Sequence, residues 1–149
     1  MSALGPDSRC PIARTLDALG DRWTLLVVRE AMFGSTRFRE FLDALGAPRD
    51  VLTARLNSLV DGGVLERRPY KPEGGRTRDE YVITEAGRAL APVLAALGEW
   101  GLRYRPNGKG PLVDFVDAQT GESARIAFVS GGRQLSIDQV ATQVATRVV

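Results

Sequence analysis

The chain has 149 residues, of which 44% are hydrophobic and 26% are charged, and this composition fits one folded domain with a small appendage. Its net charge is only +2, which permits a polyanionic partner without requiring one. The sequence contains no histidine, and this excludes the common catalytic triads and most zinc sites. We therefore expect a protein that is not an enzyme and that needs no cofactor and no metal.

The start of the chain carries no signal for secretion or membrane insertion. Residues 1–20, "MSALGPDSRCPIARTLDALG", lack the apolar core and the cleavage site of a signal peptide. The longest aliphatic run, "LLVV" at residues 25–28, is far too short to cross a bilayer. The single cysteine rules out an internal disulfide, in agreement with a reducing compartment. A cytoplasmic protein without a membrane partner is expected.

Four helices are expected up to residue 63. The first is "PIARTLDALG" (residues 11–20), which a proline opens and a glycine ends. Asp21 is a good cap for "RWTLLVVREAMFG" (22–34), a helix with so many apolar residues that it should form the centre of the core. Ser35 or Thr36 is expected to cap "RFREFLDAL" (37–45), and "RDVLTARLNSLVDGG" (49–63) follows after a short link.

The fourth helix has an outward side of unusual composition. Opposite its leucines lie Asp50, Ala54, Asn57, Ser58 and Asp61, with Thr53 and Arg55 at the edges. A helix that faces only water more often carries long glutamate and lysine side chains. The short side chains therefore indicate that another surface can approach this helix closely.

A hairpin with a cationic tip follows the fourth helix. Its expected strands are "VLERRPY" (64–70) and "RDEYVIT" (78–84), with Val64, Leu65, Tyr81 and Ile83 inward, and its turn is Gly74-Gly75. Between Glu66 and Arg78 the basic side chains outnumber the acidic ones; they are Arg67, Arg68, Lys71, Arg76 and Arg78. Two helices joined by a tight link and followed by such a hairpin have the order of a winged helix-turn-helix. In that fold one helix enters the major groove of DNA and the hairpin lies along the adjacent backbone or minor groove.

A longer helix is expected over residues 85–105, with Thr84 as its cap and Pro92 either kinking it or resetting its start. One broad apolar stripe runs along it and consists of Leu90, Val93, Leu94, Leu97, Trp100 and Tyr104. The stripe has two uses that stay open, pairing with a second subunit and packing on the domain's own core.

The composition changes after Tyr104. "RPNGKGP" reads as a linker, "LVDFVDA" (112–118) and "SARIAFVS" (123–130) as strands around the turn "QTGE", and "GGRQ" (131–134) as a further turn. The last stretch, "LSIDQVATQVATRVV" (135–149), has Val140, Val144 and Val148 at helical spacing, although its β-branched content also permits a strand. The expected fold class is thus α+β, with a winged helix-turn-helix domain over residues 1–105 and a small β-rich extension over residues 106–149.

Five segments, in this order, resemble the HxlR family of bacterial transcriptional regulators, which are MarR-like winged-helix proteins. They are "CPIARTLDALGDRWTLLVVREAMFG", "RFREFLDAL", "VLTARLNSLVDGGVLERRPY", "YVITEAGRAL" and "PVLAALGEWG", and together they cover about residues 10–105. The resemblance implies a homodimer, formed by the first and last helices of this region, that binds a nearly two-fold symmetric operator. Leu16 and the stripe of the long helix are the expected dimerisation residues. Members of the family repress or activate, and we expect repression here.

The family's cysteine in its first segment matches Cys10, and in several relatives this thiol senses electrophiles or oxidants. At the start of a helix a thiolate is favoured by the helix dipole, with Arg9 and Arg14 nearby in sequence. Because the chain has no second cysteine, a disulfide would join Cys10 to its equivalent across the dimer or to a small thiol. A buried structural role for Cys10 and an effector that is a small molecule or an electrophile both remain open.

Three groups of residues are the expected contacts to double-stranded DNA. Base edges or nearby phosphates are assigned to Arg49, Thr53, Arg55 and Asn57, phosphates to Ser35, Thr36 and Arg37, and the backbone or minor groove to Arg76 and Arg78. Alternatives remain open for some of them. Arg55 can instead pair with an acid such as Asp61 or Glu40, and Ser35 and Thr36 can serve only as caps. A winged-helix module that binds proteins and not DNA is the alternative function.

Overall fold

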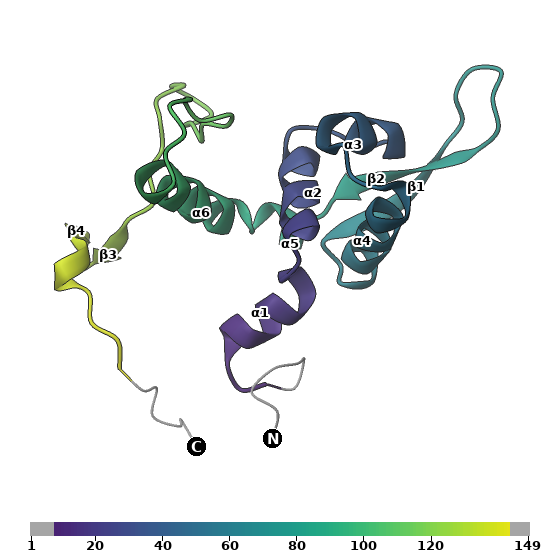
Figure 1. Ribbon diagram of the computed structural model, residues 1–149. Coiled ribbons are helices and arrows are strands. Elements are labelled where there is room, and N and C mark those ends of the chain that lie inside the picture. Colours follow the sequence, from purple (N-terminus) through teal and green to yellow (C-terminus); the bar gives the residue numbers. More distant parts are fainter. Residues whose placement is uncertain (1–7, 144–149) are drawn as a thin grey trace. The chain divides into compact units, whose positions relative to one another are not determined.

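The computed structural model describes residues 8–143 of the chain (Figure 1). The chain forms two compact units, Met1–Leu94 and Ala95–Val149. Among the described residues, no helix has both the length and the apolar character that crossing a bilayer requires. The division expected from composition, after residue 105, stays a prediction.

The first unit is built around four helices, α1 (Pro11–Leu19), α2 (Arg22–Met32), α3 (Phe38–Leu45) and α4 (Arg49–Asp61) (Figure 1). α2 supplies Val27 and Val28, which are fully buried together with Phe41 of α3 and Leu56 of α4. α2 also begins as expected, because the Asp21 carboxylate accepts a hydrogen bond from the Trp23 amide at 2.8 Å. The prediction that this helix lies at the centre of the core is confirmed.

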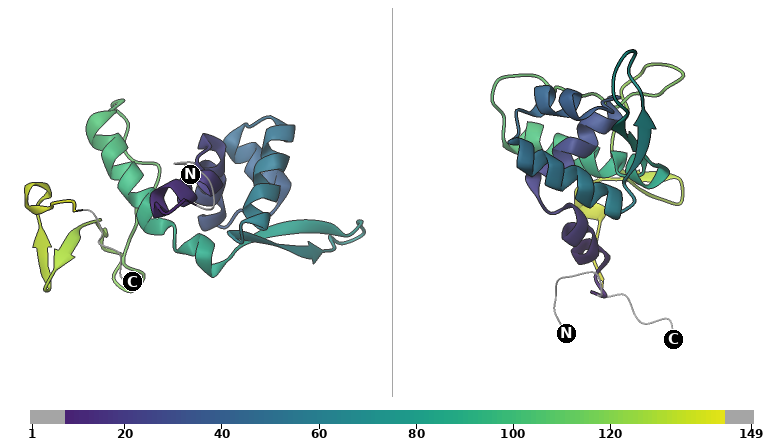
Figure 2. Two further views of the ribbon diagram at one scale, coloured as in Figure 1. Left: turned by 90° about the horizontal axis from the view of Figure 1, so that it is seen from below. Right: turned by 90° about the vertical axis from the view of Figure 1, so that its right-hand side faces the viewer.

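The hairpin consists of β1 (Leu65–Tyr70) and β2 (Arg78–Ile83), which pair antiparallel with Leu65 opposite Ile83 and Tyr70 opposite Arg78. Leu65 is buried, and Tyr81 and Ile83 pack against the core, as the alternation of the strands predicts. The loop between the strands reaches well beyond α3 and α4 (Figure 2). The base of the hairpin is therefore anchored in the core, while its tip is free to meet another molecule.

Between α2 and α3 the chain also pairs with the hairpin. The Tyr81 amide donates to the Thr36 carbonyl at 2.6 Å, and Arg37 forms an antiparallel bridge with Glu80. This isolated bridge and the Tyr81–Thr36 hydrogen bond join β2 to the segment just before α3.

The single helix expected over residues 85–105 is in fact two helices, α5 (Glu85–Arg88) and α6 (Ala91–Tyr104). Thr84 caps α5 by accepting from the Gly87 amide at 3.1 Å. Pro92 is the second residue of α6, a position where a missing amide costs no helical hydrogen bond, so the proline resets the helix and does not kink it.

Gly87 holds α5 close to the start of the hairpin. A Cβ atom at this position would lie 2.4 Å from the Val64 carbonyl oxygen and 2.6 Å from Cγ1 of Ile83. Only glycine permits this approach of α5 to β2.

The second unit contains most of α6, the strands β3 (Phe128–Ser130) and β4 (Arg133–Leu135), and a short 3-10 helix, η1 (Ile137–Gln139). The turn expected at 131–134 is present, with Gly131 and Gly132 at positive φ, but β4 already begins at Arg133. The strand expected over 112–118 is wrong, because these residues contribute only a bridge between Val116 and Ser123. The strand expected over 123–130 is limited to its last three residues.

The strands are short because, among the described residues, little of their side-chain surface is buried. Phe128 is 55% exposed and Val129 is 64% exposed, so burial adds little to the backbone pairing. The segment expected as a helix or a strand over residues 135–149 begins with Leu135, the last residue of β4. From there to residue 143 it contains only the single turn of η1, which Val140 follows. Val144 and Val148 lie outside the described residues.

Candidate nucleic-acid interface

α4 presents the surface that its sequence predicts. Its apolar side, with Leu52, Leu56 and Leu59, is almost completely buried. Asp50, Ala54, Ser58 and Asp61 are exposed. Short side chains thus cover the outer side of the helix, and a duplex can come close to it.

A polar row at four-residue spacing runs along α4 through Arg49, Thr53 and Asn57. Arg49 and Thr53 are exposed and Asn57 is half-buried. The Thr53 hydroxyl donates to the Arg49 carbonyl at 2.8 Å, and the Arg49 guanidinium lies 5.1 Å from the centre of the Phe38 ring. The row offers a cation, a hydroxyl and an amide, which are groups that contact phosphates and base edges.

Arg67 of β1 contacts the end of this row. Its Nη2 donates a hydrogen bond to Oδ1 of Asn57, and its guanidinium lies 5.9 Å from the centre of the Tyr81 ring. The sequence analysis counts Arg67 among the cations of the hairpin but assigns it no contact, because no periodic pattern joins a helix residue to a strand residue across a glycine turn. Arg67 thus connects the hairpin to α4.

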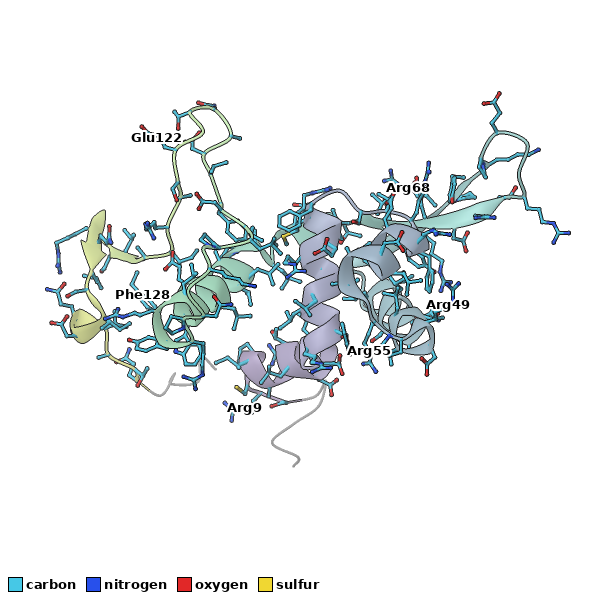
Figure 3. The ribbon with its side chains drawn as sticks, turned by 45° about the horizontal axis from the view of Figure 1, so that its top comes forward. Arg9, Arg49, Arg55, Arg68, Glu122 and Phe128 are labelled. Carbon is cyan, nitrogen blue, oxygen red and sulfur yellow. The ribbon has the colours of Figure 1, made fainter. Side chains whose placement is uncertain are left out.

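Arg55 makes an ion pair within the protein. Its Nε lies 3.9 Å from Oδ1 of Asp21, the cap of α2, and this Nε is buried without a hydrogen-bond partner. An internal pair was one of the two alternatives, but the expected partners, Asp61 and Glu40, are wrong. Figure 3 shows Arg55 and Arg49 on different parts of the α4 surface.

The start of α3 differs from the expectation. The cap is Arg37, not Ser35 or Thr36, and the Glu40 carboxylate accepts from the Thr36 and Arg37 amides at 2.8 Å and 2.9 Å. The Ser35 amide donates to the Glu30 carbonyl at 3.1 Å. The two hydrogen bonds that the Glu40 carboxylate accepts lower the pKa of Glu40, and the bond from the Arg37 amide has the larger effect.

Because these amides are already bonded, a phosphate at this point would meet side chains and not a free helix N-terminus. The Arg37 side chain is exposed, and its guanidinium lies 4.8 Å from the centre of the Tyr70 ring at the base of the hairpin.

The tip of the hairpin carries cations without acidic partners. Arg76, Arg78 and Lys71 are exposed, and no ion pair within residues 8–143 involves any of them. Arg68, by contrast, pairs with Glu66 on the same strand (Figure 3). The tip therefore presents three exposed cations that form no ion pair with the part of the chain that the structure describes.

Cys10 is the cap residue of α1, and its thiol is free and exposed. Within one subunit, Cys10 therefore lies at the surface and not in the core. The Cys10 amide donates to the Ser8 hydroxyl at 3.2 Å, and Arg14 donates to the Ser8 carbonyl at 2.6 Å.

Large apolar side chains are exposed on α1 and α6. On α1 they are Ile12 and Leu16, and on α6 they are Val93, Leu97, Trp100 and Tyr104, each at least 40% exposed. Leu90 and Leu94 instead pack against the core of the first unit. The apolar stripe is thus divided between packing within the chain and a face that is left uncovered.

The packed helices α2, α3 and α4, followed by the hairpin with its cationic tip, define a winged helix-turn-helix protein. Residues 18–109 match the model of the HxlR-like helix-turn-helix family, so the chain belongs to the HxlR family of transcriptional regulators. It is similar to the uncharacterised HTH-type regulator Rv3095 of Mycobacterium tuberculosis, with 42% identity over 76% of this chain and 70% of that protein.

Two solved structures extend the comparison. PA1607, described as a candidate transcription factor, is 36% identical and superposes with a TM-score of 0.79 over 93% of this chain and 96% of its own. The redox regulator HypR in its reduced form is 31% identical, with a TM-score of 0.58 over 64% of this chain and 94% of its own. The helix-turn-helix fold and a role in transcription regulation follow from these matches.

Proposed function

We propose that the protein binds a nearly palindromic DNA operator as a homodimer and represses transcription. In this proposal α4 enters the major groove with Arg49, Thr53 and Asn57, and the hairpin tip contacts the flanking backbone or minor groove. The observation that carries the proposal is that short side chains cover the outer side of α4, while Arg76 and Arg78 are exposed and form no ion pair with any described residue. Phosphates would supply the negative charge that the hairpin lacks within the protein.

The exposed apolar side chains support the dimer. Leu16 of α1, and Leu97 and Trp100 of α6, are each more than half exposed, an unusual condition for side chains of this size. A second subunit would cover them and would present a second α4 to the other half of the operator.

The experiment is a salt titration of binding to DNA from the region upstream of the protein's own gene, after footprinting has located the protected segment. A DNA-binding protein loses affinity steeply as salt increases, because each phosphate contact releases counterions. Random duplex DNA of equal length is the control, and the operator should bind at least 10³-fold more tightly. Affinity for neither duplex would favour the alternative function, a module that binds another protein.

Thiol sensing through Cys10 is a second proposal. It is supported by the exposure of the thiol at the start of α1, a helix whose Ile12 and Leu16 belong to the proposed dimer face. With one cysteine and a reducing cytoplasm as the proposed location, oxidants or electrophiles would modify Cys10 alone. Mobility-shift binding before and after a mild oxidant tests this, with Cys10→Ser as control. Equal binding of the oxidised and reduced protein would rule out sensing.

A further inference from the structure

We propose that Arg67 fixes the side-chain amide of Asn57 so that α4 presents N–H donors to the major groove and selects guanine over adenine at one position of each half-site. The proposal rests on the proposed DNA-binding function and adds the base that is read. Asn57 is then the specificity-determining residue, and Arg67 is a positioning residue that acts through it.

The argument begins with the orientation of the amide. A guanidinium group has five N–H donors and no acceptor, so the atom that Arg67 contacts must be the Asn57 oxygen. The usual ambiguity between oxygen and nitrogen of an asparagine amide is removed by this partner. Nδ2, with its two hydrogens, is therefore the atom left for another molecule.

Arg67 is itself held in place from two directions. Its backbone lies in β1 directly opposite Tyr81 of β2, and its guanidinium is 5.9 Å from the centre of that ring. The hydrogen bond to Asn57 is charge-assisted, which makes it stronger than one between neutral groups. The positive charge also polarises the amide and strengthens its N–H groups as donors.

Adenine and guanine present different hydrogen-bonding groups in the major groove, and the orientation of the Asn57 amide decides which of them it can bind. Asparagine reads adenine by accepting from N6 and donating to N7, and this bidentate contact needs a free amide oxygen. Guanine presents two acceptors, O6 and N7, in the same place. The Asn57 oxygen keeps a second lone pair, but Arg67 uses one of the two and places a positive charge beside the other, which disfavours a second N–H donor such as adenine N6. The amide therefore favours guanine over adenine.

The position of Asn57 makes this contact accessible. It is the third member of the row that begins with Arg49 and Thr53, and its side chain is only half-buried. β1 therefore approaches α4 at the end of the row without covering it.

The test is a selection of binding sites from a randomised duplex library with the full-length protein and four variants. The wild type should enrich guanine at one position of each half-site, and Asn57→Ala should reduce this preference about tenfold or more. Arg67→Met keeps a long stem beside Tyr81 but has no N–H, so it frees the amide oxygen and should raise adenine at that same position.

Two further variants keep the result interpretable. Asn57→Asp retains an acceptor for Arg67 and has almost the same shape, but it lacks the N–H donors and should also lose the guanine preference. Arg68→Met removes the neighbouring cation, which pairs with Glu66 and not with Asn57, and should leave the selected base unchanged.

The outcomes separate this inference from the proposed function. If the wild type binds no duplex in a salt-dependent way, the proposed function fails. If the wild type binds tightly, two other results would overturn only the assignment of Asn57 and Arg67. One is that Arg67→Met selects the same bases as Arg68→Met. The other is that the position affected by Asn57→Ala is adenine in the wild type.

Discussion

Nε of Arg55 in α4 lies 3.9 Å from the carboxylate of Asp21, the residue that caps α2. The two side chains are 34% and 40% exposed, so water screens the pair and its contribution to stability is small, about 0–1 kcal/mol. The pair matters more for electrostatics, because Asp21 neutralises a cation that would otherwise be available to DNA.

The first prediction concerns the salt dependence of DNA binding. Arg55→Gln should leave the slope of log affinity against log salt nearly unchanged, whereas Arg49→Gln, at an exposed cation without an acidic partner, should lower it by about 1. Fluorescence anisotropy with the operator duplex measures both slopes. A reduction for Arg55→Gln equal to that for Arg49→Gln would show that Arg55 contacts a phosphate in spite of Asp21.

A second prediction concerns the hairpin tip. Removing the charge of Arg76 and Arg78 together should weaken binding to operator and random DNA by the same factor and lower the salt slope by about 2, because in the proposed complex these residues contact phosphates and not bases. Arg125→Gln, an exposed cation of the second unit, is the matched control and should change neither quantity. A loss confined to the operator would instead assign the tip a role in base recognition.

The third prediction concerns Glu40, whose carboxylate accepts from the amides of Arg37 and Thr36. These hydrogen bonds lower its pKa in the folded state, so the carboxylate stabilises the fold above the ordinary glutamate pKa of about 4.3, and this stabilisation is lost as the pH falls through the lowered value. Glu40→Ala should therefore lower the free energy of unfolding by about 1 kcal/mol at pH 7.

Urea unfolding of the wild type and Glu40→Ala at several pH values provides the measurement. The difference between the two proteins should shrink in acid, because the protonated carboxyl of the wild type no longer accepts these hydrogen bonds as well. Glu40→Gln keeps an acceptor oxygen without the charge and should lie between them. A difference that stays constant down to acid pH would argue against the capping role of the ionised carboxylate.

The sequence predicted the first unit well because its signals are local. Apolar spacing located α1 to α4, and the alternation of Leu65, Tyr81 and Ile83 located the hairpin and its inward side. The contacts that shape the candidate interface are not local. Arg67 reaches Asn57, and Arg55 reaches Asp21, only after the helices pack, and neither pair leaves a pattern along the chain.

The errors have equally specific causes. Ser35 and Thr36 have the side chains of good caps, but pairing of this segment with β2 extends the backbone to Arg37, where Glu40 satisfies the amides. The β-branched residues near Val129 favour strands, yet Val129 and its neighbour Phe128 stay exposed, so burial does not lengthen β3.

The last prediction concerns the exposed apolar face of α6. Leu97 is 51% exposed, so an arginine at this position can be solvated in the isolated subunit and should not prevent folding. In a dimer the same charge would be buried without a partner, which is strongly unfavourable. Leu97→Arg should therefore be monomeric by analytical ultracentrifugation and should lose about 10²-fold or more in operator affinity, because the two half-sites are no longer bound together.

Ala118→Arg, at an exposed turn of the second unit, tests whether any added charge has this effect, and it should leave the mass and the affinity unchanged. Circular dichroism confirms that both variants keep their helices. If Leu97→Arg remains a dimer with full affinity, α6 does not form the subunit interface, and the exposed Ile12 and Leu16 of α1 become the face to change next.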